Sequence, residues 1–225
     1  MINNRVVSLL YRSILVTLSF IGVFLSSDIL KGTFNVDLFV FYTHLSNILC
    51  LVVIIIVLVY NFKKVYNNET IGHNEVIVKL KGAATLAILI TGVVYHLLLG
   101  NPSEAGFFNL DNLLVHYVVP FMFVLDWLLF DKRHTFSVID PLTWTAIPLV
   151  YLTYALIRGV IVGPNGNPQY PYFFINVTEI GYDGVAVWGL ILLVAFLGVG
   201  YLIWFIDKLV KVDGKIKVVL NNKED

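Results

Sequence analysis

The sequence predicts an all-α protein, a bundle of six transmembrane helices, and composition, apolar runs and charge distribution lead to this prediction. Of its 225 residues, 58% are hydrophobic and only 13% are charged, and the mean hydropathy is +0.84. Soluble domains carry about 25% charged residues, so this chain has too little charge to cover a water-exposed surface. Its apolar residues do not alternate in segments of about ten, as those of a transmembrane β-barrel would.

Six apolar runs are long enough to cross a bilayer, because roughly 20 helical residues span about 30 Å of hydrocarbon. The predicted spans are residues 6–29, 39–62, 76–99, 110–130, 142–162 and 184–206. Pro120 and Pro148 fall inside two of these spans, where neighbouring helices can satisfy the carbonyls that the prolines free. Residues 1–210 are expected to form one domain, and residues 211–225 a polar cytoplasmic tail.

Positive charge predicts the orientation, since Lys and Arg concentrate on the cytoplasmic side of membrane proteins. The side that holds both termini carries 13 of the 15 Lys and Arg residues, and the other side carries only Lys31 and Arg158. Both termini are therefore expected in the cytoplasm. The protein is expected to be a multi-pass protein of the cell (cytoplasmic) membrane, and the Asn-, Ile- and Lys-rich composition points to a bacterium.

Net charge and cysteine content narrow the possible partners. The formal net charge is +0, so no overall field attracts nucleic acid. The single cysteine, Cys50, lies within an apolar run and is expected to pack as a small hydrophobic side chain. No nucleic acid, metal or cofactor is expected as a partner, and the sequence does not predict the oligomeric state.

Polar side chains gather in the outer half of the predicted bundle. At 1.5 Å per residue, Thr43 lies roughly 6 Å and His116 roughly 9 Å below the outer boundary. Thr43, Ser46 and Asn47 share one helix face. Scattered polar residues would fall at mixed depths, so this convergence predicts a site. Its other candidate members are His44, Tyr95, His96, Asp111, Asn112, Arg158, Tyr182 and Asp183.

The cluster could support acyl transfer on a lipid ester that reaches it from the bilayer. Thr43 would be the nucleophile and a neutral His116 the general base. Ser46 or Asn47 could donate to the oxyanion. Asp111 or Asn112 could orient the imidazole. Substrate contacts would come from His44, His96, Arg158 and Tyr182, with Arg158 holding an anionic group.

Structural roles for the same residues stay open. Threonine, serine and asparagine in membrane helices commonly hydrogen-bond between helices, and an arginine near a helix end can snorkel to the interface. His44, His96 and His116 could together bind zinc or haem, although no metal-binding spacing occurs among them. A transporter or a lipid-binding sensor is the remaining alternative, and the off-centre cluster argues against transport.

Three further features carry expectations. Arg12 lies near the start of the first span and is expected to snorkel. Asp126 lies in the inner half of the fourth span and is expected to be a structural acid near Lys132 and Arg133. The aromatic segment 170–174 is either an interfacial anchor or a cover over a lipid-facing cleft.

Four short segments carry a family resemblance. They are residues 41–47 (FYTHLSN), 116–120 (HYVVP), 126–130 (DWLLF) and 170–172 (YPY). They resemble the androgen-induced and androgen-dependent (TFPI-regulating) membrane protein family and its bacterial six-span relatives, over most of the chain. Eukaryotic members are threonine hydrolases that cleave fatty acid esters of hydroxy fatty acids. The resemblance implies Thr43 as nucleophile and His116 as base, while the polar pair Ser46-Asn47 departs from the family pattern.

Overall fold

The regular structure of the described chain is entirely helical. The computed structural model describes residues 4–67 and 74–209, and every regular element within these ranges is a helix. Six segments are long and apolar enough to cross a membrane, which confirms the predicted number: Arg5–Ser26, Tyr42–Tyr66, Glu75–Leu99, Leu110–Phe130, Asp140–Asn165 and Val177–Leu209. The predicted polar tail, residues 211–225, lies outside the described residues.

Some of these segments are assembled from more than one element. The α-helices are α1 (Arg5–Ser26), α2 (Tyr42–Tyr66), α3 (Glu75–Val94), α4 (Leu110–Leu113), α5 (Val119–Phe130), α6 (Asp140–Trp144), α7 (Ala146–Val162) and α8 (Val177–Leu209). Asparagines begin two of them, because the side chains of Asn4 and Asn74 accept hydrogen bonds from first-turn N–H groups of α1 and α3. Such caps satisfy donors that have no partner inside the helix.

Several span boundaries differ from the prediction for local reasons. The second span begins at Tyr42 rather than residue 39, since the 3₁₀ turn η2 (Val36–Val40) occupies the preceding residues. The fifth span is broken at Thr145, between α6 and α7. The sixth begins earlier than predicted and bends at Gly181, whose φ of 69° suits a residue without a Cβ.

Two spans contain a π-helical turn in the half away from the N-terminus of α1. These turns are η3 (Tyr95–Leu99), which continues α3, and η4 (Leu114–Val118), which joins α4 to α5. Pro120 has no N–H to bond the carbonyl of His116, four residues earlier. Gly92 of α3 faces that carbonyl, since a Cβ on Gly92 would lie 3.1 Å from the His116 oxygen. The helices therefore approach closely where both depart from regular α-geometry.

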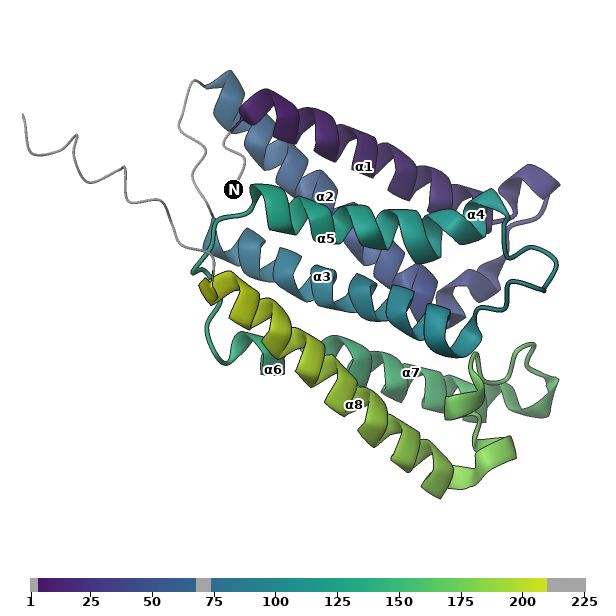
Figure 1. Cartoon of the computed structure of the whole chain (residues 1–225). Coiled ribbons are helices and arrows are strands. Elements are labelled where there is room, and N and C mark those ends of the chain that lie inside the picture. Colours follow the sequence, from purple (N-terminus) through teal and green to yellow (C-terminus); the bar gives the residue numbers. More distant parts are fainter. Residues whose placement is uncertain (1–3, 68–73, 210–225) are drawn as a thin grey trace, which may run out of the picture.

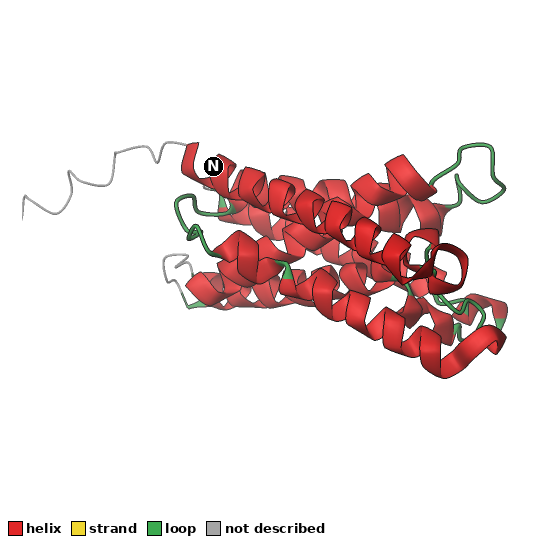
Figure 2. Ribbon diagram, turned by 90° about the horizontal axis from the view of Figure 1, so that it is seen from below, coloured by secondary structure: helices red, strands yellow, loops and turns green. Residues whose placement is uncertain are grey.

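α3 lies between two groups of helices (Figure 1). α2 and α5 pack on one side of it with α1 against them both, while α7 and α8 lie on the other side. Seen from below, the helices run lengthwise and the connections lie at the two ends (Figure 2). Half of the α3 span is buried, against 11% of the α7 span and 17% of the α8 span. α7 and α8 are thus the loosely packed part of the bundle.

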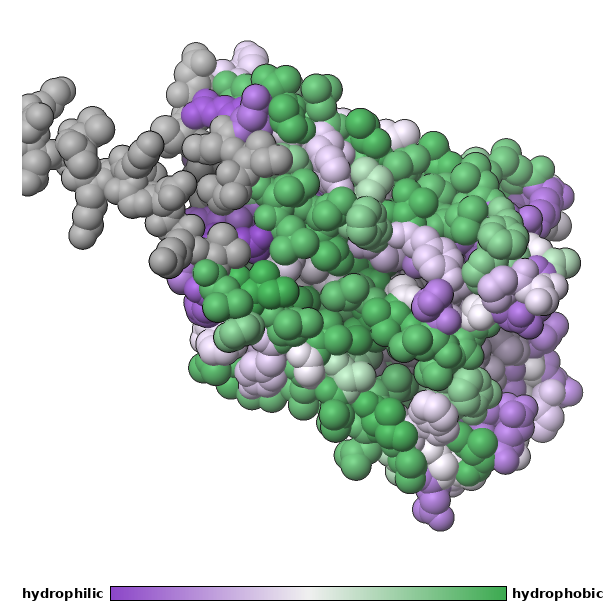
Figure 3. All heavy atoms as spheres, in the orientation of Figure 1, coloured by the Kyte–Doolittle hydropathy of each residue, from purple (hydrophilic) through white to green (hydrophobic). Residues whose placement is uncertain are grey.

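The surface has the pattern of a protein immersed in lipid. Figure 3 shows hydrophobic side chains over the middle of the molecule and hydrophilic ones at both ends. α1 begins and α8 ends at the same end of the bundle, which we call the basic end (Figure 1). The described Lys and Arg residues nearer that end are Arg5, Arg12, Lys63, Lys64, Lys79, Lys81, Lys132, Arg133 and Lys208. An apolar belt between polar ends fits six crossings of a bilayer.

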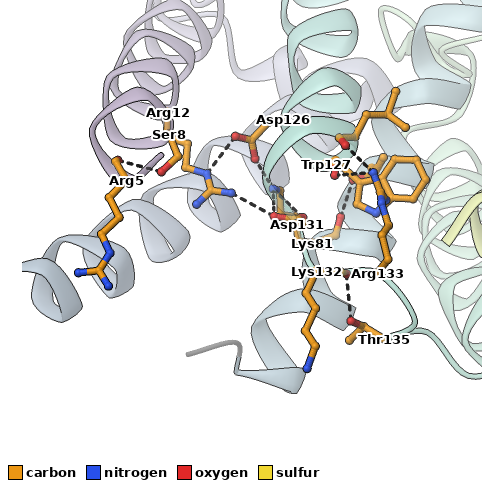
Figure 4. A network of polar contacts seen from close by, with 12 residues as sticks. Arg5, Ser8, Arg12, Lys81, Asp126, Trp127, Asp131, Lys132, Arg133 and Thr135 are labelled. Carbon is orange, nitrogen blue, oxygen red and sulfur yellow. Dashed lines mark hydrogen bonds and ion pairs between the residues drawn. The ribbon is translucent and has the colours of Figure 1, made fainter. Parts of the chain in front are cut away.

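Four buried charged side chains form an ionic cluster near the basic end (Figure 4). Its members are Arg12 of α1, Lys81 of α3, Asp126 of α5 and Asp131 just after α5. Arg12 Nε lies 2.9 Å from Asp126 and its Nη2 lies 3.0 Å from Asp131. Lys81 Nζ contacts Asp126 and lies 2.7 Å from Asp131. Each cation thus bridges both carboxylates, and the charges balance.

This cluster corrects two expectations. Arg12 does not snorkel, because it is only 4% exposed and its guanidinium is paired inside the bundle. Asp126 is a structural acid, but its partners are Arg12 and Lys81 rather than the predicted Lys132 and Arg133. Arg133 instead lies over the Trp127 ring, 4.5 Å from its centroid, and donates to the Leu128 carbonyl. The sequence placed Arg12 near a helix end, whereas packing pairs it with Asp126 inside the bundle.

Candidate functional site

Two hollows flank the half of α3 farther from the basic end. The threonine cavity lies between α2, α3, α7 and α8, and the histidine groove lies between α3 and the η4–α5 segment. Thr43 lines the first and His116 lines the second. The two predicted catalytic residues therefore line different hollows, although α2 and η4 are in direct contact beside them through Asn47.

The threonine cavity is small and almost wholly apolar. Its volume is about 90 Å³. An engineered cavity of about 150 Å³ lined by apolar side chains accepts benzene, so this one suits a narrower group such as a stretch of methylenes. Its lining carries no charged side chain among the described residues, and its main members are Tyr42, Thr43, Ile90, Thr91, Val94, Tyr151, Leu152, Tyr172, Leu192 and Phe196.

Hydroxyl groups from three elements meet at one end of this cavity. The Thr43 backbone N–H donates to the Tyr172 hydroxyl over 3.4 Å. The Tyr151 hydroxyl donates to the Val40 carbonyl over 2.9 Å. Burial raises the pKa of Tyr172, which keeps its hydroxyl protonated at neutral pH. The buried Tyr42 hydroxyl has no hydrogen-bond partner within the described chain. The cavity is thus amphipathic, with phenols at one end and aliphatic side chains beyond them.

The other end of the cavity reaches the lipid-facing surface between α7 and α8. Leu149 of α7 lines the cavity and is 47% exposed. Gly189 of α8 also lines it, and a Cβ there would have only Leu152 nearby, at 3.8 Å. α8 packs chiefly on α3, α6 and the 3₁₀ turn η6 (Phe173–Ile175) rather than on α7. A chain could therefore reach the cavity sideways, between these two helices.

The imidazole of His116 is held in one tautomer and one orientation. Its Nδ1 lies 3.1 Å from the Asn112 carbonyl, which can only accept, so Nδ1 carries the proton and a neutral ring leaves Nε2 as an acceptor. The ring stacks on Tyr95 with centroids 3.6 Å apart. The Asn112 side chain donates to the Tyr95 hydroxyl over 2.7 Å and to the Phe107 carbonyl over 2.8 Å. Asn112 thus orients His116 through its carbonyl and through Tyr95.

Ser46 and Asn47 hold helices together in this structure. The Ser46 hydroxyl lies 2.8 Å from that of Thr91 and also donates to the Thr43 carbonyl. The Asn47 amide donates to the carbonyls of Thr43 and Val115, over 2.8 and 3.0 Å. Both amide hydrogens of Asn47 are therefore used, and neither is free to donate to an oxyanion.

The predicted substrate-binding residues do not gather in either hollow. Arg158 donates to the carbonyls of Pro168 and Gln169 and lies 3.6 Å from Asp37, so it ties the 163–176 connection to α7. Tyr182 is 69% exposed. His96 lines the histidine groove, where its Nδ1 lies 3.4 Å from the Tyr117 hydroxyl.

His44 and Asp111 line neither of the two hollows. The His44 ring packs edge-on against Phe41, with centroids 6.1 Å apart, and its buried Nδ1 has no partner within residues 4–67 and 74–209. His44 is close enough to His116 and to Asp111 to interact electrostatically with both. The described residues contain no group of three or more His, Cys, Asp and Glu side chains arranged to hold a metal ion.

Thr43 and His116 do not share a hollow, and no hydrogen bond joins their side chains in the described structure. Three tyrosines that were not among the predicted site residues surround Thr43 instead: Tyr42, Tyr151 and Tyr172. The signal for Tyr172 was its place in the aromatic segment 170–174, of which Tyr172 and Phe174 line the cavity. Tyr42 and Tyr151 carried no signal beyond their aromatic character.

Comparison with known proteins adds no identity. The chain matches no family model, no curated protein and no solved structure.

Proposed function

We propose that this protein binds the acyl chain of a membrane lipid in the threonine cavity, with the ester or acid carbonyl of that lipid at the phenol end. The observation that carries the proposal is the buried hydroxyl of Tyr42, a residue that lines the cavity, since this hydroxyl has no hydrogen-bond partner among the described residues. A buried donor left unpaired costs about 1–3 kcal/mol, and the hydrocarbon layer holds no water to satisfy it. A lipid carbonyl supplies the missing acceptor.

The polarity of the cavity supports the same ligand. Thr43 lies at the start of α2, at the end of the bundle away from the basic end, whereas Leu149 and Phe196 lie within α7 and α8, deeper in the bundle. We infer that the basic end faces the cytoplasm, because 13 of 15 Lys and Arg residues belong to that side. The phenols would then lie near the headgroups of the outer leaflet, and the aliphatic part toward the bilayer centre, as in the lipid itself.

Filling the cavity tests this proposal. Gly189→Leu should occupy the cavity without a clash, since the nearest atom to its Cβ is 3.8 Å away. Gly198→Leu on the same helix is the matched control, because a Cβ there meets nothing within 4 Å. Binding of radiolabelled methyl palmitate to purified protein in detergent should fall about tenfold or more in Gly189→Leu, since burial of a few methylenes is lost. Equal binding by both variants would exclude the cavity as the site.

Tyr42→Phe tests the role of the phenol. It removes the donor and keeps the ring contacts with Tyr151 and Phe196. Methyl palmitate should bind about two- to tenfold more weakly, as expected for one hydrogen bond, while hexadecane should bind equally well to both proteins. If Tyr42→Phe binds the ester as tightly as the native protein does, the Tyr42 hydroxyl does not bond the ligand.

Hydrolysis of the bound ester, with Thr43 as nucleophile and His116 as base, is a second candidate function. Two observations favour it: Thr43 lies at the phenol end of the cavity, and His116 keeps Nε2 free to accept a proton. The Nε2 atom must come within about 3 Å of the hydroxyl for proton transfer, so the helices around α3 must rearrange at the level of η4.

Release of palmitate from methyl palmitate measures this activity. Thr43→Ala and His116→Ala should each abolish it, together with labelling by a fluorophosphonate probe, while both variants remain folded. Thr153→Ala is the control, because Thr153 is exposed on α7 and bonds only its own helix, at the Leu149 carbonyl. If the native protein binds methyl palmitate but releases no palmitate from it, lipid binding remains as the function and hydrolysis is excluded.

A further inference from the structure

The histidine groove has features of a second lipid site, on the opposite side of α3 from the threonine cavity. Its volume is about 390 Å³, and apolar residues of α3, η3 and α5 form its walls, among them Val93, Leu97 and Phe121. Leu97 is 71% and Phe121 is 66% exposed, so the groove opens to the outside of the bundle. Both lie within spans, where the surrounding medium is lipid rather than water.

Three polar residues are among those that line this groove, although its accessible surface is almost entirely apolar. His96, His116 and Tyr117 line it, and the π-helical turns η3 and η4 carry all three. His96 and Tyr117 face each other, with His96 Nδ1 3.4 Å from the Tyr117 hydroxyl. His116 lies roughly 9 Å along its helix from Leu110, at 1.5 Å per residue. The groove thus combines an apolar length with polar groups at the depth of lipid ester and hydroxyl groups.

The chemistry of the missing partner follows from the His116 ring. Its Nδ1–H is used by the Asn112 carbonyl, and stacking on Tyr95 fixes the ring plane. A charged imidazolium facing hydrocarbon would be costly, so the ring is neutral and Nε2 can only accept. Nε2 has no protein partner in the described part of the chain. A ligand that satisfies it must therefore bring a hydrogen-bond donor.

We propose that the histidine groove binds a membrane lipid that carries a hydroxyl donor, with the hydroxyl on His116 Nε2 and the chain along Val93 and Phe121. This assignment differs from that of the threonine cavity, where the unpaired group is a donor and the ligand must accept. Simple diesters of glycerol phosphate without a free hydroxyl would be poor ligands of the groove. Monoacylglycerols, fatty alcohols and other hydroxylated lipids have the required group.

The test compares two photoreactive lipids that differ only in the donor. One is a hexadecanol that carries a diazirine in its chain, and the other is its methyl ether. In native protein reconstituted in phosphatidylcholine nanodiscs, the alcohol should label peptides of α3 and α5 about fivefold more than the ether, as expected for one hydrogen bond. Equal labelling by both probes would overturn the proposal.

Three variants locate the site. His116→Phe keeps an aromatic ring against Tyr95 and should abolish the preference for the alcohol; a preference that persists would refute the role of Nε2. Val93→Trp should block the groove and lower labelling by both probes. Val160→Trp is its control, since Val160 is 66% exposed on α7 and lines neither hollow. Unchanged labelling in Val93→Trp would place the lipid elsewhere.

Discussion

Removing one charge from the ionic cluster should cost far more stability than removing a balanced pair. In Lys81→Met, Asp126 and Asp131 are left with only Arg12, so one buried negative charge is uncompensated. Breaking a buried ion pair in this way typically costs about 3–5 kcal/mol. Lys81 is 1% exposed, so neither water nor salt screens the loss.

The double variant Lys81→Met/Asp126→Leu restores balance. Arg12 and Asp131 remain paired at 3.0 Å, and two apolar side chains fill the vacated space. Replacing a buried pair by packed apolar residues is commonly neutral, so we expect this protein within about 1 kcal/mol of the native one. The double variant should therefore be at least about 2 kcal/mol more stable than Lys81→Met.

Reversible unfolding in mixed dodecylmaltoside and SDS micelles, followed by circular dichroism, measures these differences. Lys79→Met is the control on the same helix, since the Lys79 side chain is 40% exposed and its contact with Asp140 is 3.3 Å long. Such a pair is worth about 1 kcal/mol at most. A Lys81→Met protein as stable as Lys79→Met, or a double variant no better than Lys81→Met, would refute the view that pairing makes these charges tolerable.

Two further stability predictions rest on single contacts. Gly92→Ala should be about 1–2 kcal/mol less stable than Gly198→Ala in the same unfolding assay. The new methyl group at residue 92 meets the His116 carbonyl at 3.1 Å, whereas residue 198 has open space around it. Equal stabilities would show that the π-helical turn can shift to accommodate the methyl group at no cost in free energy. Asp207→Ala should cost about 2–3 kcal/mol and increase hydrogen exchange in residues 134–137, because Asp207 Oδ2 accepts from the Thr135 and Phe136 N–H groups at 3.0 and 3.1 Å; exchange that stays unchanged there would contradict this anchoring role.

The number of spans could be predicted from sequence because hydropathy is additive along a helix. Pairing between helices is not visible in such a sum. Arg12 was therefore expected to snorkel at a helix end, although Asp126 and Asp131 neutralise both Arg12 and Lys81 within the bundle. The break at Thr145 and the π-helical turns also escaped prediction, since they alter hydrogen bonding without changing the apolar character of the span.

The depth of a side chain in the membrane was also easier to predict than the direction in which it points from its helix. Counting residues along helices brings Thr43 and His116 to similar levels, but it does not fix how each helix is turned toward its neighbours. In the structure, Thr43 lies on the α7 and α8 side of α3, and His116 lies in the groove along α5. The phenols of Tyr42, Tyr151 and Tyr172 come from three separate elements, so only the tertiary structure brings them to Thr43.

Mapping of a bound acyl chain tests the central claim most directly. A palmitate methyl ester with a diazirine at mid-chain would be photolysed with the native protein in nanodiscs, and the labelled residues identified by mass spectrometry. Adducts concentrated on Ile90, Leu192 and Phe196, which line the threonine cavity, are the predicted result. Adducts distributed evenly over exposed residues such as Val59 and Val160, with none in the cavity, would contradict it.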